Sequence, residues 1–295
     1  MSNSRNDIIE RINQISSRKM REVCFLLCSE DIPNSHIPLQ LQYPRFSFEK
    51  EGKLAIDQTF LENKDLLKEL EALSDKTALG RYAERLLSIW FKHSPHFDLL
   101  KFNHQIVIDK LTVGEIDFLL KEVDSKRAIQ LEFALKYFLA FGAHDQRQFI
   151  GPKGKDSLES KSRKLIDQQM QLSLNHSEML EESLRSLDFR PQIMLKGELF
   201  YPLDQKQSQN HWLHYKDLKK LSIWDKNSEF LILTYRRDWI FPFDKDLWQN
   251  NIGSSECIDQ LAKKNADLPI MIAYKDGKVY GRIMLVSDNW PAKQA

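Results

Sequence analysis

The sequence predicts a mixed α/β fold, and three observations support this prediction. The stretch 105–139 contains three consecutive segments, at 105–111, 114–122 and 128–139, in which apolar and polar residues alternate, as they do in strands with one buried face. Amphipathic helical patterns precede and follow these segments. The chain has 295 residues, of which 42% are hydrophobic and 11% aromatic, so it can form a substantial core. This length suits one large domain or two modest ones.

The second and third predicted strands, at 114–122 and 128–139, place acidic residues opposite an apolar face. Alternation puts Glu115 and Asp117 on one side of the second strand and its apolar residues on the other. The same rule puts Glu132 on the polar side of the third strand. Two adjacent strands therefore present carboxylates on a shared side, which is the kind of surface that binds divalent cations.

A helix is predicted immediately before the strands, within 77–94. Its inward stripe has helical spacing and consists of Leu79, Tyr82, Ala83, Leu86 and Trp90. Glu84 lies at the edge of this stripe. Two readings stay open for it: a carboxylate that faces a site beside the core, or a solvated glutamate on the flank of the helix.

A second helix is predicted after the strands, at 158–175, with leucines repeating every seven residues at Leu158, Leu165 and Leu172. Lys161 and Gln168 occupy inward positions between these leucines. Polar groups on an inward face need partners, so both are candidate site residues. The alternative is that they reach past the edge of the packed face to solvent.

The rest of the chain predicts helices over 5–30, an extended crossing with three prolines over 31–60, and a surface helix over 61–73. A further strand is predicted at 191–201, and a closing hairpin at Asp276-Gly277. We divide the chain into an N-terminal helical segment and crossing, a core, and a C-terminal extension packed on the core. These segments are 1–76, 77–203 and 204–295.

Charge and cysteine content limit the class of protein. The 43 basic and 42 acidic residues give a net charge of +1, which argues against a protein dedicated to coating nucleic acid. Three cysteines are too few for a disulfide framework and fit a reducing compartment. The polar N-terminus is not a signal peptide, and no apolar run approaches the ~18 residues that span a bilayer. The expected location is the cytoplasm, with no membrane partner.

The order helix, three strands, helix, strand, with acids on the first helix and on the second and third strands, resembles the PD-(D/E)XK nuclease superfamily. The quartet GEID at 114–117 and the later Glu132 match its pattern of acidic residues. The chain is also similar to a bacterial family, domain of unknown function 1853, in the stretches LGRYAERLLSIW, TVGEIDFLL, LEFALKYFL, LKGELFYP and RRDWIFP. The resemblance implies a restriction-endonuclease-like αβββαβ core, a mixed sheet flanked by helices, with N-terminal helices and a C-terminal α+β extension.

The resemblance also implies a metal-dependent phosphodiesterase that acts on nucleic acid, with DNA favoured over RNA. Asp117 and Glu132 would bind Mg²⁺ or Mn²⁺ with the Phe133 carbonyl, and Glu84 would complete or orient the shell. A lysine would assist the attacking water, and Gln168 would be an auxiliary polar residue beside the metal. The oligomeric state stays open, with a homodimer as one option.

One position departs from the superfamily pattern, because Ala134 stands where a lysine is expected two residues after Glu132. Lys136 shares that face but lies roughly 13 Å along the strand from Glu132 at ~3.3 Å per residue. Lys161 is the other candidate, supplied from the following helix. The alternative function is a catalytically impaired protein with this fold that binds nucleic acid or a protein partner. A weaker alternative is a structural protein.

Overall fold

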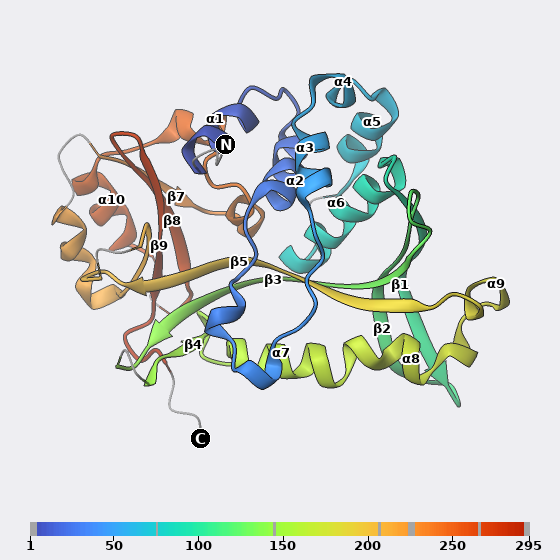
Figure 1. Cartoon of the computed structure of the whole chain (residues 1–295). Coiled ribbons are helices and arrows are strands. Elements are labelled where there is room, and N and C mark those ends of the chain that lie inside the picture. The colour runs from blue at the N-terminus through green and yellow to red at the C-terminus, as the bar shows by residue number, and fades with distance from the viewer. Residues whose placement is uncertain are drawn as a thin grey trace. The chain divides into compact units, whose positions relative to one another are not determined.

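The computed structural model of the chain describes residues 5–74, 76–143, 146–205, 208–223, 228–264 and 267–291 (Figure 1). The chain forms two compact units. The unit that we call the acid-bearing unit comprises Glu22–Leu135 and Glu159–Lys196. The other, called the C-terminal unit, comprises Met1–Arg21, Lys136–Leu158 and Gly197–Ala295. The three segments predicted from the sequence are not tested by this division and stay a prediction.

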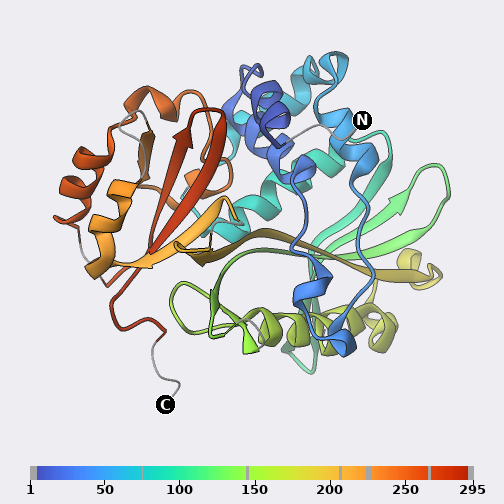
Figure 2. The same ribbon diagram turned by 60° about the vertical axis from the view of Figure 1, so that its left-hand side comes forward.

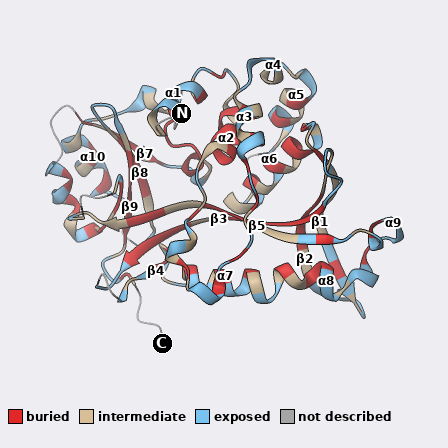
Figure 3. Cartoon of the chain, viewed as in Figure 1, coloured by how far each residue is buried: buried red, intermediate tan, exposed pale blue. Residues whose placement is uncertain are grey.

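The strands of the acid-bearing unit are hydrogen-bonded in the order β1-β2-β3-β5. Their bounds are Phe97–Ile108 for β1, Leu111–Glu122 for β2, Ala128–Phe141 for β3 and Phe189–Pro202 for β5. The β1–β2 and β2–β3 pairs are antiparallel. Strands β3 and β5 continue into the C-terminal unit at Lys136 and Gly197. Strand β3 is buried along most of its length (Figure 3).

Helices cover both sides of these strands. The main helices are α2 (Arg18–Cys28), α3 (Glu49–Ala55), α4 (Gln58–Leu61), α5 (Lys64–Ala72), α6 (Leu79–His93), α7 (Leu158–Asp167), α8 (Leu172–Asn175) and α9 (Glu182–Arg185). Helices α6 and α7 lie on opposite sides of β3 and β5 in both views (Figures 1 and 2). The strands are therefore enclosed between a helix that precedes them in the chain and one that follows.

Helix α6 packs through the apolar stripe that its sequence predicts. Four members of the predicted stripe are buried, namely Tyr82, Ala83, Leu86 and Trp90, and Leu79 is half-buried. On the same helix Phe91 packs edge-to-face on Phe118 of β2, with ring centroids 5.5 Å apart. These contacts hold α6 against the strand that carries Asp117.

The C-terminal unit continues the mixed sheet in the order β3-β5-β6-β9-β8-β7, and β4 pairs with β3. The added strands are β4 (Gln148–Ile150), β6 (Asn210–His214), β7 (Glu229–Leu233), β8 (Ile270–Asp276) and β9 (Val279–Val286), with helices α1 (Arg5–Ile12) and α10 (Ser254–Leu261). The β5–β6 and β6–β9 pairs are parallel, whereas β7–β8 and β8–β9 are antiparallel. The predicted closing hairpin is confirmed: Asp276 pairs with Val279, and Gly277 has φ +59° in the turn.

The mixed α/β class is thus confirmed, but the first predicted strand was wrong in extent. We predicted residues 105–111, whereas β1 begins at Phe97 and ends at Ile108. Irregularities in its register at Leu99/Lys101 and Ile106/Val107 interrupt the alternation that marks a strand in sequence. In the described ranges, no helix has the length and apolar character needed to cross a membrane.

Candidate functional site

The hydrogen-bonded ladder between β2 and β3 ends where the two candidate acids begin. The last pair in its register is Phe118 opposite Leu131. The next facing positions on these antiparallel strands are Asp117 and Glu132. Both residues are buried, with exposed fractions of 8% and 0%. Alternation predicted their shared side but not that this side is enclosed.

Asp117 accepts a hydrogen bond from the backbone of the opposite strand. The Phe133 N–H donates to Oδ2 of Asp117 at 2.8 Å. The backbone of Asp117 in turn lowers the pKa of the Glu132 carboxylate. We call this arrangement of Asp117, Glu132 and Phe133 the carboxylate clasp. It connects the two strands at the position where their regular pairing stops.

Two glutamines hold the carboxylate of Glu132 within the clasp. Gln130 Nε2 donates to Oε1 at 2.9 Å, and Gln169 Nε2 donates to Oε2 at 3.1 Å. Gln130 is fully buried, and its Oε1 accepts from the Ser173 N–H at 3.1 Å. Since a backbone N–H can only donate, this bond directs the Gln130 amide nitrogen toward Glu132. Neither Gln130 nor Gln169 is among the site residues predicted from the sequence, although alternation places Gln130 on the same face as Glu132.

Lys161 connects to the same network from α7. Its Nζ donates to Oε1 of Gln169 at 3.3 Å, and Gln169 in turn donates to Glu132. The positive charge of Lys161 lowers the pKa of Asp117, of Glu132 and of Glu84. The candidate lysine on α7 is therefore close enough to act on all three predicted acids.

Burial makes ionisation of the paired acids unfavourable. It raises the pKa of Asp117 well above its ordinary value, and the neighbouring Glu132 raises it further. Burial also raises the pKa of Glu132 to about 7, although the hydrogen bond from Gln130 and the charge of Lys161 lower it. Near neutral pH, the clasp therefore holds carboxyl groups that favour a proton or another cation.

Glu84 joins this group from α6. Burial raises its pKa, and Glu115 raises it further by repulsion. Glu115 also raises the pKa of Glu132. Glu84 is half-buried and its charge raises the pKa of Asp117, so its place in a site stays a prediction.

Gln168 does not take the place predicted for it. It is exposed, whereas the adjacent Gln169 contacts Glu132. The predicted helix 158–175 ends at Asp167, and Gln168 has φ −121° and ψ −65°, outside helical geometry. A short 3₁₀ segment, Gln169–Gln171, follows before α8. This break turns Gln168 outward and Gln169 inward.

The adjacent glutamines provide a matched pair for testing this network. We expect Gln169→Ala to lower the free energy of unfolding at pH 8 by about 2 kcal/mol, because it removes a donor from a buried carboxylate. Gln168→Ala should change it by less than about 0.5 kcal/mol. Urea denaturation of both variants measures the difference. Equal effects would contradict the assignment of Gln169 to the network.

Lys136 belongs to the C-terminal unit, where its Nζ donates to Oδ2 of Asp156 at 2.8 Å. The two side chains have exposed fractions of 36% and 40%. Lys136 therefore has a carboxylate partner of its own. Lys161, in contrast, lies within the unit that holds the acids.

The donor set of the clasp suits a hard cation. In the part of the chain that the structure describes, no group of three or more His, Cys, Asp or Glu side chains forms a metal site. A pair of carboxylates is nevertheless what Mg²⁺ commonly receives from proteins, with water and substrate oxygens supplying the rest. Oδ1 of Asp117 accepts no hydrogen bond from the described residues. The clasp therefore fits Mg²⁺ or Mn²⁺ better than a closed structural zinc site.

Comparison with known families identifies the chain. The family model described as Domain of unknown function (DUF1853) matches residues 21–286. The chain belongs to the DUF1853 family. The matched range includes the carboxylate clasp, both glutamines that hold it, Glu84 and Lys161. Neither the curated proteins nor the solved structures contained a match.

Proposed function

We propose that this DUF1853 protein is a divalent-metal-dependent nuclease of the PD-(D/E)XK type. The observation that carries the proposal is the clasp, in which Asp117 and Glu132 are buried side by side with raised pKa values. The charge of Lys161 lowers the pKa of Asp117, of Glu132 and of Glu84. A bound divalent cation would supply the positive charge that this group of acids lacks.

The protein's own side chains have distinct roles in the proposed reaction. Asp117 and Glu132 bind the cation, with the predicted Phe133 carbonyl as a further ligand and Glu84 at the edge of the shell. Gln169 fixes the orientation of Glu132, as groups behind a metal ligand commonly do. Bound Mg²⁺ or Mn²⁺ lowers the pKa of water and neutralises charge that develops on a scissile phosphate.

Lys161 is the proposed catalytic lysine, in place of the residue missing at Ala134. Its ammonium is directed at the network by its bond to Gln169. There it would stabilise negative charge on the phosphate in the transition state. Lys136 is paired with Asp156, so we assign it no catalytic role.

The two lysines give a direct test of this assignment. We expect Lys161→Met to reduce the rate of Mg²⁺-dependent cleavage by about 10²-fold, which is the usual cost of removing one charge-stabilising group. Lys136→Met should retain the rate within about threefold and lose at most ~1 kcal/mol of stability, since its ion pair is half exposed. Single-turnover cleavage of labelled DNA and RNA, single- and double-stranded, provides the measurement.

The reverse result, an inactive Lys136 variant and an active Lys161 variant, would contradict the assignment. Omission of the cation, or addition of EDTA, should abolish cleavage by the wild type. The panel of substrates also decides between DNA, which we favour, and RNA.

The second candidate is a catalytically impaired descendant of such a nuclease that binds nucleic acid. Ala134 at the usual lysine position favours it. This candidate predicts no cleavage with any cation, but retained binding of nucleic acid that weakens steeply with salt.

A further inference from the structure

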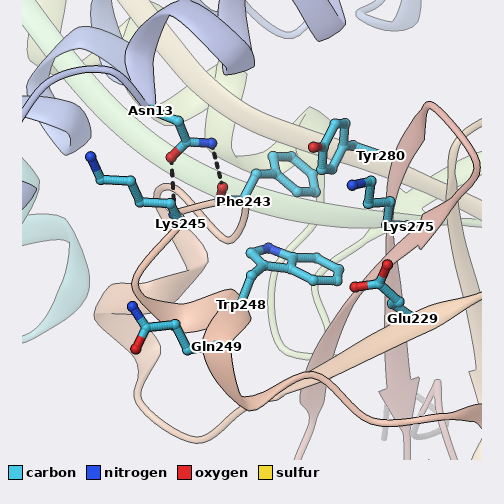
Figure 4. Close-up of a pocket in the computed structure, with 8 residues that line it drawn as sticks. All are labelled: Asn13, Glu229, Phe243, Lys245, Trp248, Gln249, Lys275 and Tyr280. Atoms are coloured by element: carbon cyan, nitrogen blue, oxygen red, sulfur yellow. Dashed lines mark hydrogen bonds between the residues drawn. The ribbon is translucent and has the colours of Figure 1, made fainter.

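A separate cavity lies in the C-terminal unit, far along the chain from the clasp. Its volume is about 270 Å³, and its walls combine aromatic rings with charged and amide side chains (Figure 4). The lining residues are Asn13, Glu229, Phe243, Lys245, Trp248, Gln249, Lys275 and Tyr280. None of them belongs to the proposed metal site.

The wall of this cavity is rigid and aromatic. Tyr280 packs on Phe243 and on Trp248, with ring centroids 5.4 and 6.3 Å apart. Trp248 is further fixed by its indole N–H, which donates to the Pro242 carbonyl at 3.0 Å. Asn13 fixes the adjoining backbone through bonds to Phe243 and Lys245. Rings held in this way provide a stacking surface for a planar ligand at little cost in entropy.

The polar groups lie on two sides of the tryptophan. Lys275 and Glu229 are on one side, and Lys245 and Gln249 are on the other (Figure 4). Lys275 lies over the Tyr280 ring, with Nζ 5.5 Å from its centroid. Within the described ranges, no hydrogen bond or ion pair engages the Glu229 carboxylate or the Lys245 ammonium. One side therefore offers an acceptor beside a donor, and the other offers a cation.

We propose that this cavity binds a purine nucleotide, with guanine as the preferred base. The base would stack on Trp248, with its N–H groups toward Glu229 and its carbonyl toward Lys275. Lys245 would contact the phosphate. Guanine fits this edge because it presents two adjacent N–H donors next to a carbonyl, whereas adenine has an amino group but no carbonyl.

Titration calorimetry with GMP, AMP and guanosine tests the proposal. We expect saturable binding in the order GMP, guanosine, AMP for the wild type. Trp248→Leu should weaken GMP binding about tenfold, in the range found for stacked bases, and Trp248→Phe should retain it within about threefold. Glu229→Gln should remove the preference for GMP over AMP, and Lys245→Ala should make GMP and guanosine bind equally.

Two control variants test whether GMP binding depends on this cavity. Lys278→Ala removes an exposed lysine from the β8–β9 turn outside the cavity and should leave GMP affinity unchanged. Asp117→Asn should also bind GMP normally, because this site does not depend on the proposed nuclease. Failure of the wild type to bind GMP at up to about 5 mM would overturn the proposal. Unchanged affinity in a folded Trp248→Leu variant would do so as well.

Discussion

Asp117→Asn is expected to reduce metal-dependent cleavage by at least about 10³-fold and to leave the protein folded. The substitution removes the charge that would bind the cation and so removes its effect on the attacking water and the phosphate. An asparagine Oδ1 can still accept the hydrogen bond from the Phe133 N–H that Asp117 receives at 2.8 Å. Loss of activity without loss of structure would separate the chemical role of Asp117 from its structural one.

The matched control for this variant is Asp109→Asn, in the turn of the same β1–β2 hairpin. Asp109 is exposed and has φ +49°, a conformation that asparagine also adopts readily. We expect wild-type activity within about twofold for this control. Single-turnover cleavage gives the rates, and circular dichroism with urea denaturation checks the fold. A folded Asp117→Asn protein that cleaves at the wild-type rate would refute the proposed site.

The second large effect is expected in the pH dependence of stability without metal. Burial raises the pKa of Glu132 in the folded state to about 7 from an ordinary value of 4.5. The folded protein therefore binds a proton more tightly than the unfolded chain between these values. The contribution of Glu132 to the free energy of unfolding should thus fall as pH rises from about 4.5 to about 7. Asp117, whose pKa is also raised by burial, adds to the fall. The contribution of Glu132 is on the order of 3 kcal/mol.

Glu132→Gln should make the fall in the free energy of unfolding shallower, because it removes one of the titrating groups. The comparison uses the slope with pH and not the absolute stability, since a glutamine amide would face the donors of Gln130 and Gln169. Urea denaturation at intervals from pH 4.5 to 8 measures both slopes. Identical slopes in wild type and variant would show that Glu132 titrates normally in the folded protein.

A bound cation should restore the free energy of unfolding that is lost at high pH. We expect Mg²⁺ or Mn²⁺ to raise the unfolding midpoint of the wild type at pH 8 but much less at pH 5, where protons compete for the carboxylates. The shift should be absent in Glu132→Gln. An equal shift in that variant would place the cation elsewhere on the protein. This test reads metal binding through stability and does not depend on cleavage.

Local patterns predicted the elements of the site but not its enclosure. Alternation of polar and apolar residues placed Asp117 and Glu132 on one side of their strands, and helical spacing placed Glu84 at the edge of its stripe. Alternation alone predicts that a polar face is exposed to solvent. The burial of this side depends on the helices that cover it, which pack through contacts distant in sequence.

The glutamine of the network was predicted one residue too early for a physical reason. Leu158, Leu165 and Leu172 continue a seven-residue repeat across positions 167–169, so the repeat does not reveal the break in the helix. An unbroken helix would direct Gln168 toward the site, whereas the 3₁₀ segment places Gln169 there. The choice between Lys136 and Lys161 was likewise open in sequence, because strand spacing does not show that Asp156 pairs with Lys136.

The carboxylate clasp also stabilises the pairing of strands β2 and β3. Past Phe118 and Leu131, the hydrogen bond from the Phe133 N–H to Asp117 joins the two strands where their regular pairing stops. Replacing Asp117 by an apolar residue would therefore leave the Phe133 N–H without its acceptor and also remove a proposed metal ligand. A relative that had lost all catalysis would still need an oxygen acceptor at the position of Asp117 to keep this bond between β2 and β3. An acid retained there in a family member would report on the integrity of its sheet as much as on its chemistry.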